Sequence, residues 1–262
     1  MTQRVLITND DGIKAPGLRA LAEAAQQAGL DVVVAAPAEE ASGASAAMSA
    51  YLKQGRVPIS RQPSAGFDGI PAYGVAASPA YIVVLATLET FGPAPDLVLS
   101  GINRGANAGR AILHSGTVGA AFTAAAYGMP ALAASLDVLS PLSASAGGNA
   151  LQVLDESSDA AHHWPTAAAW VRELIPRLRD LNDGFVLNLN VPDRPADEVR
   201  GLATAALAKF GQVQMAVAEA GEDFVRTSVE ENRARADRGT DLALLTDGYA
   251  TLTTVRAVAE LT

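Results

Sequence analysis

The chain contains no cysteine among its 262 residues. Disulfides, thiolate nucleophiles, iron–sulfur clusters and cysteine-based zinc sites are therefore excluded. Histidine is scarce as well: of three residues, His162 and His163 stand together before Trp164 at the expected start of a helix, far in sequence from any acidic pair. A bound metal ion would have to rely mainly on oxygen ligands, which favours a hard cation such as Mg²⁺, Mn²⁺ or Ca²⁺.

Aromatic residues and positive charge are also in short supply. Phe, Trp and Tyr make up 5% of the chain, and 19 Lys and Arg face 28 Asp and Glu, for a net charge of −9. Few stacking side chains and an acidic surface disfavour nucleic acids and anionic membranes as partners. A small phosphate ester could still bind through a cation. The chain has no unbroken run of 18 apolar residues, and its N-terminal apolar run is too short for a signal peptide, so we expect a soluble, cytoplasmic protein.

Short apolar runs alternate with helical patterns over the first 135 residues. Residues 4–9, 31–37, 96–101 and 130–135 read as buried strands, and residues 16–29, 79–91 and 118–128 read as helices. Pro16 suits the first turn of the first helix, and Gly29 suits its end. The pattern predicts an α/β fold with a doubly wound, mostly parallel, Rossmann-like sheet.

The rest of the chain follows other patterns. Residues 50–76 predict a hairpin-like excursion, residues 136–163 a surface loop, residues 165–181 a helix and residues 185–192 a strand. The runs 215–220, 223–231, 240–248 and 249–255 favour antiparallel β structure. We expect a single domain over 1–262, with an α/β core over 1–200 and a C-terminal extension over 201–262 that serves as an oligomerisation arm or a lid.

Polar residues follow several of the expected strands. They are Asn9-Asp10-Asp11-Gly12, the pair Ser42 and Ser45, the pair Asn103 and Asn107 between glycines, and Ser115-Gly116-Thr117 before a helix. Each group has a local explanation: a hydrated turn, a left-handed Asn conformation, or a helix N-cap at Thr117. Ligands of open parallel sheets, however, bind outside the carboxyl ends of the strands, where these groups would meet.

A joint site of this composition predicts phosphoryl chemistry. Two carboxylates, a hydroxyl and an amide oxygen would form a hard-oxygen cage for a cation. The N–H groups of the Ser-Gly-Thr turn would face a phosphate at a helix N-terminus. No P-loop, G-x-G-x-x-G after a strand, or G-x-S-x-G is present, which removes three common α/β enzyme classes. His114 is either a general base or a structural loop residue, and Lys14 either a rim charge or a solvated surface residue.

Three segments carry a family resemblance. The stretches "VLITNDDGIKAPGL", "SGINRGANAG" and "HSGTVGAA", in this order, resemble the survival protein SurE family of 5′/3′-nucleotidases, as does the ending "TDLALLTDGYATLTTV". The resemblance implies one divalent metal ion per subunit, Mg²⁺ or Mn²⁺, held by Asp10, Asp11, Ser42 and Asn103. It also implies phosphate contacts near Asn107 and Ser115-Gly116-Thr117, and dimers or tetramers that exchange C-terminal segments.

The resulting hypothesis is a metal-dependent phosphomonoester hydrolase acting on nucleoside monophosphates. Asp10, Asp11 and Asn107 are assigned as catalytic, and Asn9 joins the Ser-Gly-Thr turn as substrate-binding. Lys14 stands where the family usually has His, and residues 38–41 and 76–82 depart from the family pattern, which bears on substrate range. Two alternatives stay open: a metal- and nucleotide-binding protein without turnover, and a metal-dependent sugar-nucleotide transferase.

Overall fold

The computed structural model describes residues 2–41, 45–62, 66–138, 161–181, 183–211, 213–221, 223–231 and 236–256. The strands are β1 (Arg4–Thr8), β2 (Asp31–Pro37), β3 (Ile59–Arg61), β4 (Ala72–Val75), β5 (Leu97–Arg104), β6 (Ala131–Asp137), β7 (Phe185–Pro192), β8 (Leu202–Thr204), β9 (Val213–Ala220), β10 (Val225–Glu231) and β11 (Ala250–Arg256). The helices are α1 (Pro16–Gln27), α2 (Pro79–Thr87), α3 (Gly116–Ala126), α4 (Trp164–Leu174) and α5 (Asp241–Thr246), with 3₁₀ turns η1 (Gly109–His114), η3 (Ile175–Asp180) and η4 (Ala196–Glu198).

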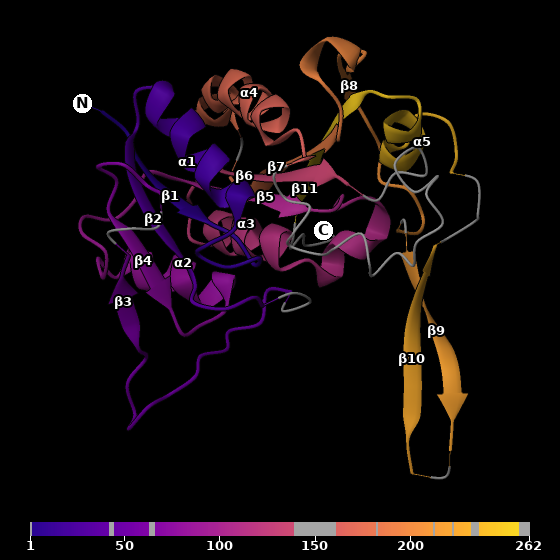
Figure 1. The fold of residues 1–262 in the computed structure, drawn as a ribbon. Helices are drawn as coiled ribbons and strands as arrows, with labels where there is room; N and C mark the ends of the chain where they lie inside the picture. Colours follow the sequence, from indigo (N-terminus) through magenta and orange to yellow (C-terminus); the bar gives the residue numbers. More distant parts are fainter. Residues whose placement is uncertain are drawn as a thin grey trace, which may run out of the picture.

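One large sheet forms the centre of the molecule, in the order β3-β4-β2-β1-β5-β6-β7-β11-β8 (Figure 1). Strands β4, β2, β1, β5, β6 and β7 are parallel, whereas β3 and β11 run antiparallel to their neighbours β4 and β7. The predicted doubly wound, mostly parallel sheet is confirmed. The chain moves outward from β1 in both directions, so the topological switch point lies between β1 and β5.

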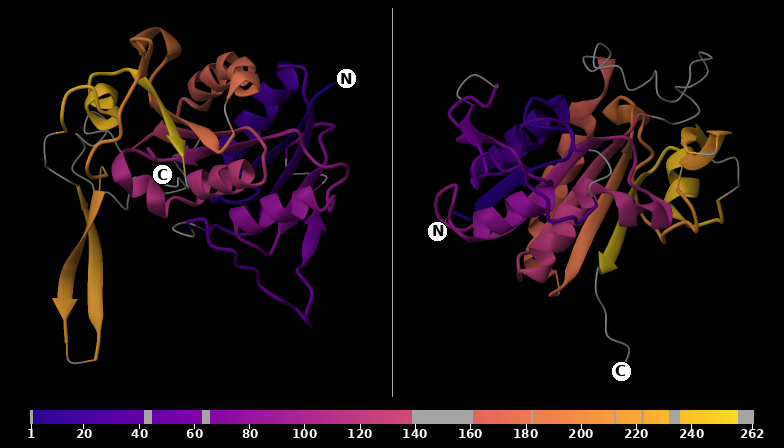
Figure 2. Two further views of the ribbon diagram at one scale, coloured as in Figure 1. Left: turned by 180° about the vertical axis from the view of Figure 1, so that it is seen from behind. Right: turned by 90° about the horizontal axis from the view of Figure 1, so that it is seen from below.

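The strands have apolar side chains on both faces because helices cover both. In β1, Val5 and Ile7 pack into the cluster that contains α1 and α4, while Leu6 packs into the cluster that contains α2 and α3. Successive side chains of a strand alternate between faces, so the continuous run "VLI" follows from double coverage. Figure 2 shows these helices on either side of the sheet. No helix in the described ranges is long and apolar enough to cross a membrane.

The C-terminal quarter departs from the sequence pattern in one element. Strands β9 and β10 form the expected antiparallel pair, which projects away from the body (Figure 1). The prediction of β structure over residues 240–248 was wrong, because α5 occupies this segment. Leu242 and Leu245, one helical turn apart, pack together against Ala108 and Ala208. Apolar side chains three residues apart lie on one face of a helix. The sequence alone does not show the small core against which this face packs.

Strand β11 joins the main sheet between β7 and β8. Part of the segment expected as an extension therefore completes the central sheet. The expected loop over 136–163 falls mostly outside the described residues, and β6 extends to Asp137. The expected excursion over 50–76 contains β3 and β4, which pair as an antiparallel edge of the sheet.

Candidate active site at the switch point

The two adjacent aspartates lie in a tight turn directly after β1. Asn9 closes this turn: its amide Nδ2 donates to the Gly12 carbonyl and its Oδ1 accepts from the Gly12 N–H, both at 3.2 Å. The Asn9 side chain is fully buried. Both ends of the Asn9 amide thus fix the turn that carries the two aspartates, and its predicted substrate contact stays a prediction.

The carboxylate of Asp10 faces the first turn of α3. Asp10 is 5% exposed and accepts a hydrogen bond from the Thr117 hydroxyl. The backbone of Gly116 and Thr117 also favours the charged form of Asp10 and so lowers its pKa. A Cβ atom on Gly116 would lie 2.7 Å from Asp10 Oδ2, so a side chain at this position would displace the carboxylate. The helix N-terminus thus supports a buried negative charge.

The Ser-Gly-Thr turn lies against Asp10. Its Thr117 hydroxyl donates to the Asp10 carboxylate and its Gly116 backbone packs against it, while the predicted phosphate contact of the turn stays a prediction. Ser115 is the N-cap, because its Oγ accepts from the Val118 N–H at 3.0 Å. The alternative explanation of Thr117 as the helix N-cap is therefore wrong. Sequence could not foresee this, since the register of a helix start depends on the neighbour it docks against.

Asn103 approaches from the end of β5. Its Nδ2 donates to the Gly105 carbonyl at 2.7 Å, and its Oδ1 lies 3.3 Å from Thr117 Oγ1. The register between β5 and β6 shifts between Ser100 and Asn103, where a Cβ on Gly101 would lie 2.2 Å from the Ala134 carbonyl. Glycine is thus required at the irregularity that precedes Asn103. The Gly105 contact orients the amide so that its oxygen faces Thr117 and Asp10.

Asp11 is the second carboxylate, and it is partly buried. Its Oδ2 accepts from the Arg104 backbone N–H at 3.2 Å. Burial raises the pKa of Asp11 to about 7, with a further contribution from the negative charge of Asp10. Burial also raises the pKa of Asp10, and its hydrogen bonds from Thr117 offset part of that effect. Two adjacent carboxylates that resist ionisation are a feature of sites that share a proton or bind a cation.

These shifts predict a pH-dependent stability of the metal-free protein. Since the pKa of Asp11 is about 7 in the folded chain, against 3.8 for an ordinary aspartate, the folded chain holds more protons than the unfolded chain between these two pH values. The free energy of unfolding should therefore fall as pH rises from about 4 through about 7. We expect Asp11→Asn to flatten the pH dependence of the melting temperature measured with chelator.

The matched control for this measurement is Asp68→Asn, at an exposed position. This variant should keep the wild-type slope, because Asp68 is exposed and both carboxyl groups of the buried pair remain in place. Addition of Mg²⁺ or Mn²⁺ at pH 8 should raise the melting temperature of the wild type more than that of Asp11→Asn. Parallel pH curves for wild type and Asp11→Asn would contradict the assignment of the slope to this carboxyl pair.

The donor set fits a hard divalent cation better than a soft one. Two carboxylates and the Asn103 amide oxygen come together, while no group of three or more His, Asp or Glu side chains that could hold a metal occurs in the described part of the chain. A cation here would need neutral oxygens as well as the two charges. Ser42, the fourth expected ligand, lies outside the described residues.

The residues that flank Ser42 are described and lie close to the site. The Ala41 N–H donates to the Asp10 carbonyl at 2.7 Å. On the other side, Ser45 Oγ donates to the Leu113 carbonyl at 2.6 Å, and a Cβ on Gly119 in α3 would lie 2.4 Å from the Ser45 carbonyl. The chain thus enters and leaves this loop beside Asp10 and beside α3.

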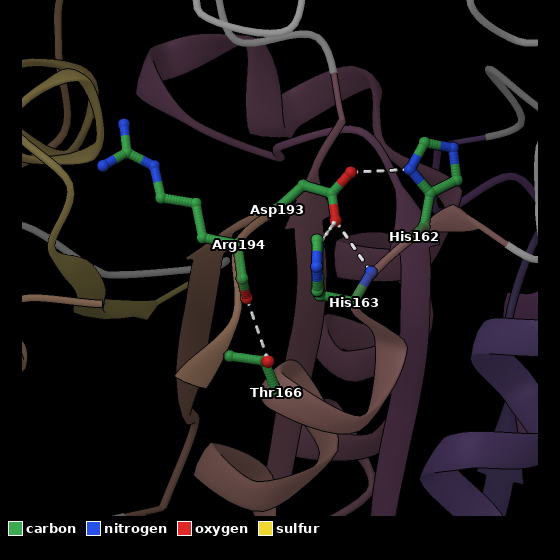
Figure 3. A network of polar contacts seen from close by, with 5 residues as sticks. All are labelled: His162, His163, Thr166, Asp193 and Arg194. Carbon is green, nitrogen blue, oxygen red and sulfur yellow. Dashed lines mark hydrogen bonds and ion pairs between the residues drawn. The ribbon is translucent and has the colours of Figure 1, made fainter. Parts of the chain in front are cut away.

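The remaining candidates, His114, Lys14 and the His162-His163 pair, have surroundings of other kinds. His114, at the end of η1, and Lys14 have exposed side chains. His162 and His163 share Asp193: their Nδ1 atoms lie 2.6 Å and 2.9 Å from its two carboxylate oxygens (Figure 3). This network joins the start of α4, as predicted for the His-His-Trp sequence, to the end of β7. It has a structural role there, which leaves the hard-oxygen cluster without imidazole.

Asn107 has contacts of a different kind. Its Nδ2 donates to Ser135 Oγ at 3.0 Å, and its backbone carbonyl accepts from Asn188 and Asn190. In the described part of the chain, the non-glycine residues with positive φ are Ser45, Gln54 and Glu89, so neither Asn103 nor Asn107 is explained by a left-handed turn. Sequence reasoning missed Asn188 and Asn190, although two Asn residues inside the apolar strand "FVLNLNVP" were a visible signal.

Comparison with known proteins gives a consistent result. The family described as "Survival protein SurE" matches residues 5–214. The 5′-nucleotidase SurE of Aeromonas hydrophila is 32% identical over 255 residues, 95% of this chain and 90% of that protein. The 5′/3′-nucleotidase SurE of Shigella dysenteriae is 32% identical over 258 residues, 97% of this chain and 90% of that protein.

A solved structure matches over a similar length. The SurE protein from Aquifex aeolicus superposes with a TM-score of 0.69 at 27% sequence identity, covering 97% of this chain and 93% of that one. The relatives and the solved structure match nearly the whole chain, and the family match covers residues 5–214. The chain belongs to the survival protein SurE family.

Proposed function

We propose that the protein is a metal-dependent hydrolase that releases phosphate from nucleoside monophosphates. The observation that carries this proposal is the meeting of Asp10, Thr117 and Asn103, from three separate segments, at the switch point of a parallel sheet. Curated relatives named 5′-nucleotidase and 5′/3′-nucleotidase support the reaction class. The alternative of a sugar-nucleotide transferase has no such support.

Asp10, Asp11, Asn103 and Ser42 are the residues that would hold a divalent cation. Mg²⁺ and Mn²⁺ are the first candidates because the donors are hard oxygens. A cation bound there would polarise a phosphoryl oxygen and acidify a bound water. The raised pKa values of Asp10 and Asp11 support this assignment, because a positive charge would relieve the repulsion between the two carboxylates.

Phosphate contacts are proposed for Asn107 and for Ser115-Gly116-Thr117. Asn107 donates one of its two amide hydrogens to Ser135, so the second can reach a phosphoryl oxygen. Charge on the equatorial oxygens would then be stabilised by a donor that is already oriented. Water is the preferred nucleophile, because the Asp10 carboxylate is 5% exposed and its oxygens accept hydrogen bonds.

The first test is release of phosphate from 5′- and 3′-nucleoside monophosphates and p-nitrophenyl phosphate, with Mg²⁺, with Mn²⁺ and with excess chelator. We expect release with metal and loss of release with chelator, restored by added metal. The cation is expected to supply several kcal/mol of transition-state stabilisation, so chelation should lower the rate by on the order of 10²-fold or more. Equal rates with and without chelator would contradict the proposal.

A binding protein without turnover is the second candidate. The departures at residues 38–41 and 76–82 favour it, because these residues lie next to the carboxyl ends of β2 and β4. Metal-dependent binding of a nucleotide with no phosphate release from any substrate would identify it. Retention of Asp10, Asp11 and Asn103 in one cluster argues for the hydrolase.

A homodimer or homotetramer is also proposed. The pair β9 and β10 projects from the body, and Val217, Phe224 and Val225 on it are exposed. A two-stranded sheet of this kind is marginally stable alone, and an apolar surface on it favours packing against a second copy. A solution molar mass equal to one chain would contradict this.

A further inference from the structure

A row of buried polar side chains crosses the sheet from the site. The strand register places Asn103 of β5 beside Ser135 of β6, Ser135 beside Asn190 of β7, and Asn190 beside Thr251 of β11. Paired residues of neighbouring strands point to the same face. Ser135, Asn190 and Thr251 are fully buried, on the sheet face that packs against α2 and α3.

Two members of this face bond to a single atom of the site loop. Asn188 Nδ2 and Asn190 Nδ2 donate to the Asn107 carbonyl at 2.8 Å and 2.9 Å. Asn107 Nδ2 in turn donates to Ser135 Oγ at 3.0 Å. The backbone and the side chain of Asn107 are thus both fixed from beneath by residues of β6 and β7.

This arrangement has an energetic cost. The Oδ1 atoms of Asn188 and Asn190 are buried and, among the described residues, have no hydrogen-bond partner. An unpaired buried carbonyl oxygen destabilises a fold, because it gives up its hydrogen bond with water and gains none. Apolar residues would fill a sheet face of this kind more favourably, as they do elsewhere in β7. Two Asn residues with this penalty donate to the same Asn107 carbonyl, which indicates that the position of Asn107 matters for function.

The geometry points to Asn188 and Asn190 as positioning residues for Asn107. They hold its carbonyl, Ser135 holds one amide hydrogen, and the second amide hydrogen is left aimed at the substrate phosphate. This inference rests on the proposed function, in which Asn107 contacts the phosphoryl group. It assigns Asn188 and Asn190 an effect on turnover that is transmitted through Asn107 alone.

The test is a set of variants assayed for phosphate release. Each Asn can still hold the Asn107 carbonyl when the other is replaced, because the two donors share this acceptor. Asn188→Ala and Asn190→Ala should therefore each lower kcat/KM by about tenfold or less, whereas the double variant should lower it by about 100-fold. The loss should fall on kcat, with KM and the metal concentration for half-activation unchanged. In an Asn107→Ala background, the same double substitution should change kcat/KM by less than about threefold.

Thr251→Val is the matched control. Thr251 pairs with Asn190 in register, is equally buried, and its hydroxyl has no partner in the described part of the chain. This variant should keep wild-type kcat and KM. Asn190→Asp guards against misfolding by Ala: it is isosteric, and the introduced carboxyl group can donate to the Asn107 carbonyl only when protonated. Its activity relative to wild type should therefore rise as pH falls.

The outcomes separate this inference from the proposed function. Additive losses in the Asn107→Ala background, or wild-type kcat in the double variant, would overturn the inference while leaving the hydrolase intact. If the wild type releases no phosphate, the proposed function fails, and affinity for inorganic phosphate with Mg²⁺ becomes the readout. Weaker phosphate binding in the double variant but not in Thr251→Val would then support the inference; equal binding would overturn it.

Discussion

Asp10→Asn should lower kcat/KM for nucleoside monophosphates by on the order of 10²–10³-fold, because it removes one of the two charges proposed to hold the cation. Asn keeps the volume of Asp, and its oxygen can still accept from Thr117, so the site should keep its shape. The loss should accompany weaker metal binding, measured as a higher Mg²⁺ or Mn²⁺ concentration for half-maximal activity.

The same substitution should have the opposite effect on the metal-free protein. Asp10 is buried beside Asp11, and burial raises the pKa of both carboxyl groups. A neutral amide at residue 10 removes this penalty, so the melting temperature with chelator at pH 8 should equal or exceed that of the wild type. Such a trade of stability for activity is common in active sites.

The control for Asp10→Asn is again the exposed Asp68→Asn, which should keep wild-type activity. Near-wild-type turnover of Asp10→Asn would remove Asp10 from the metal site. A simultaneous fall in activity and in metal-free stability would mean that the substitution damages the fold, and that its activity says little about the cation.

Asp241→Ala should destabilise the protein by about 3 kcal/mol or more, measured by urea unfolding. Asp241 is fully buried, and its Oδ2 accepts from the Gly109 N–H at 2.7 Å. Its Oδ1 accepts from the N–H groups of Ala208 and Leu242, both at 2.9 Å. Alanine would leave three buried donors without partners, each at a cost of about 1–3 kcal/mol.

Activity should fall with Asp241→Ala as well, because Gly109 follows the segment that carries Asn103, at the end of β5, and Asn107, in the loop after it. Asp241→Asn should have an intermediate effect on stability and activity. Its Oδ1 can still accept from the N–H groups of Ala208 and Leu242, but its Nδ2 would face the Gly109 N–H, so that two donors would meet. Asp247→Ala, exposed at the other end of α5, should stay within about 0.5 kcal/mol of the wild type. If Asp241→Ala also stays within about 0.5 kcal/mol of the wild type, Asp241 does not anchor the N–H groups of Gly109, Ala208 and Leu242.

The elements most faithfully predicted are those with strong local patterns. Strand β7 matches the predicted bounds, and α1 has Pro16 at its start and Gly29, with φ +79, just beyond its end. Proline and glycine act through their own backbone geometry, and a doubly covered strand is apolar throughout, so both signals survive in a single sequence. Segment 240–248 was mispredicted because its packing partners, Ala108 and Ala208, are distant in sequence.

The same division holds for the site. Sequence alone excluded cysteine ligands, since cysteine is absent, and predicted that Asp10, Asp11 and Asn103 gather at one rim, since parallel strands bring their carboxyl ends together. Tertiary structure decided which partners these groups have: Thr117 and Gly116 for Asp10, Asn188 and Asn190 for Asn107, Asp241 for Gly109. Such contacts join segments up to 132 residues apart. Their geometry depends on helix docking and strand register, which no local pattern encodes.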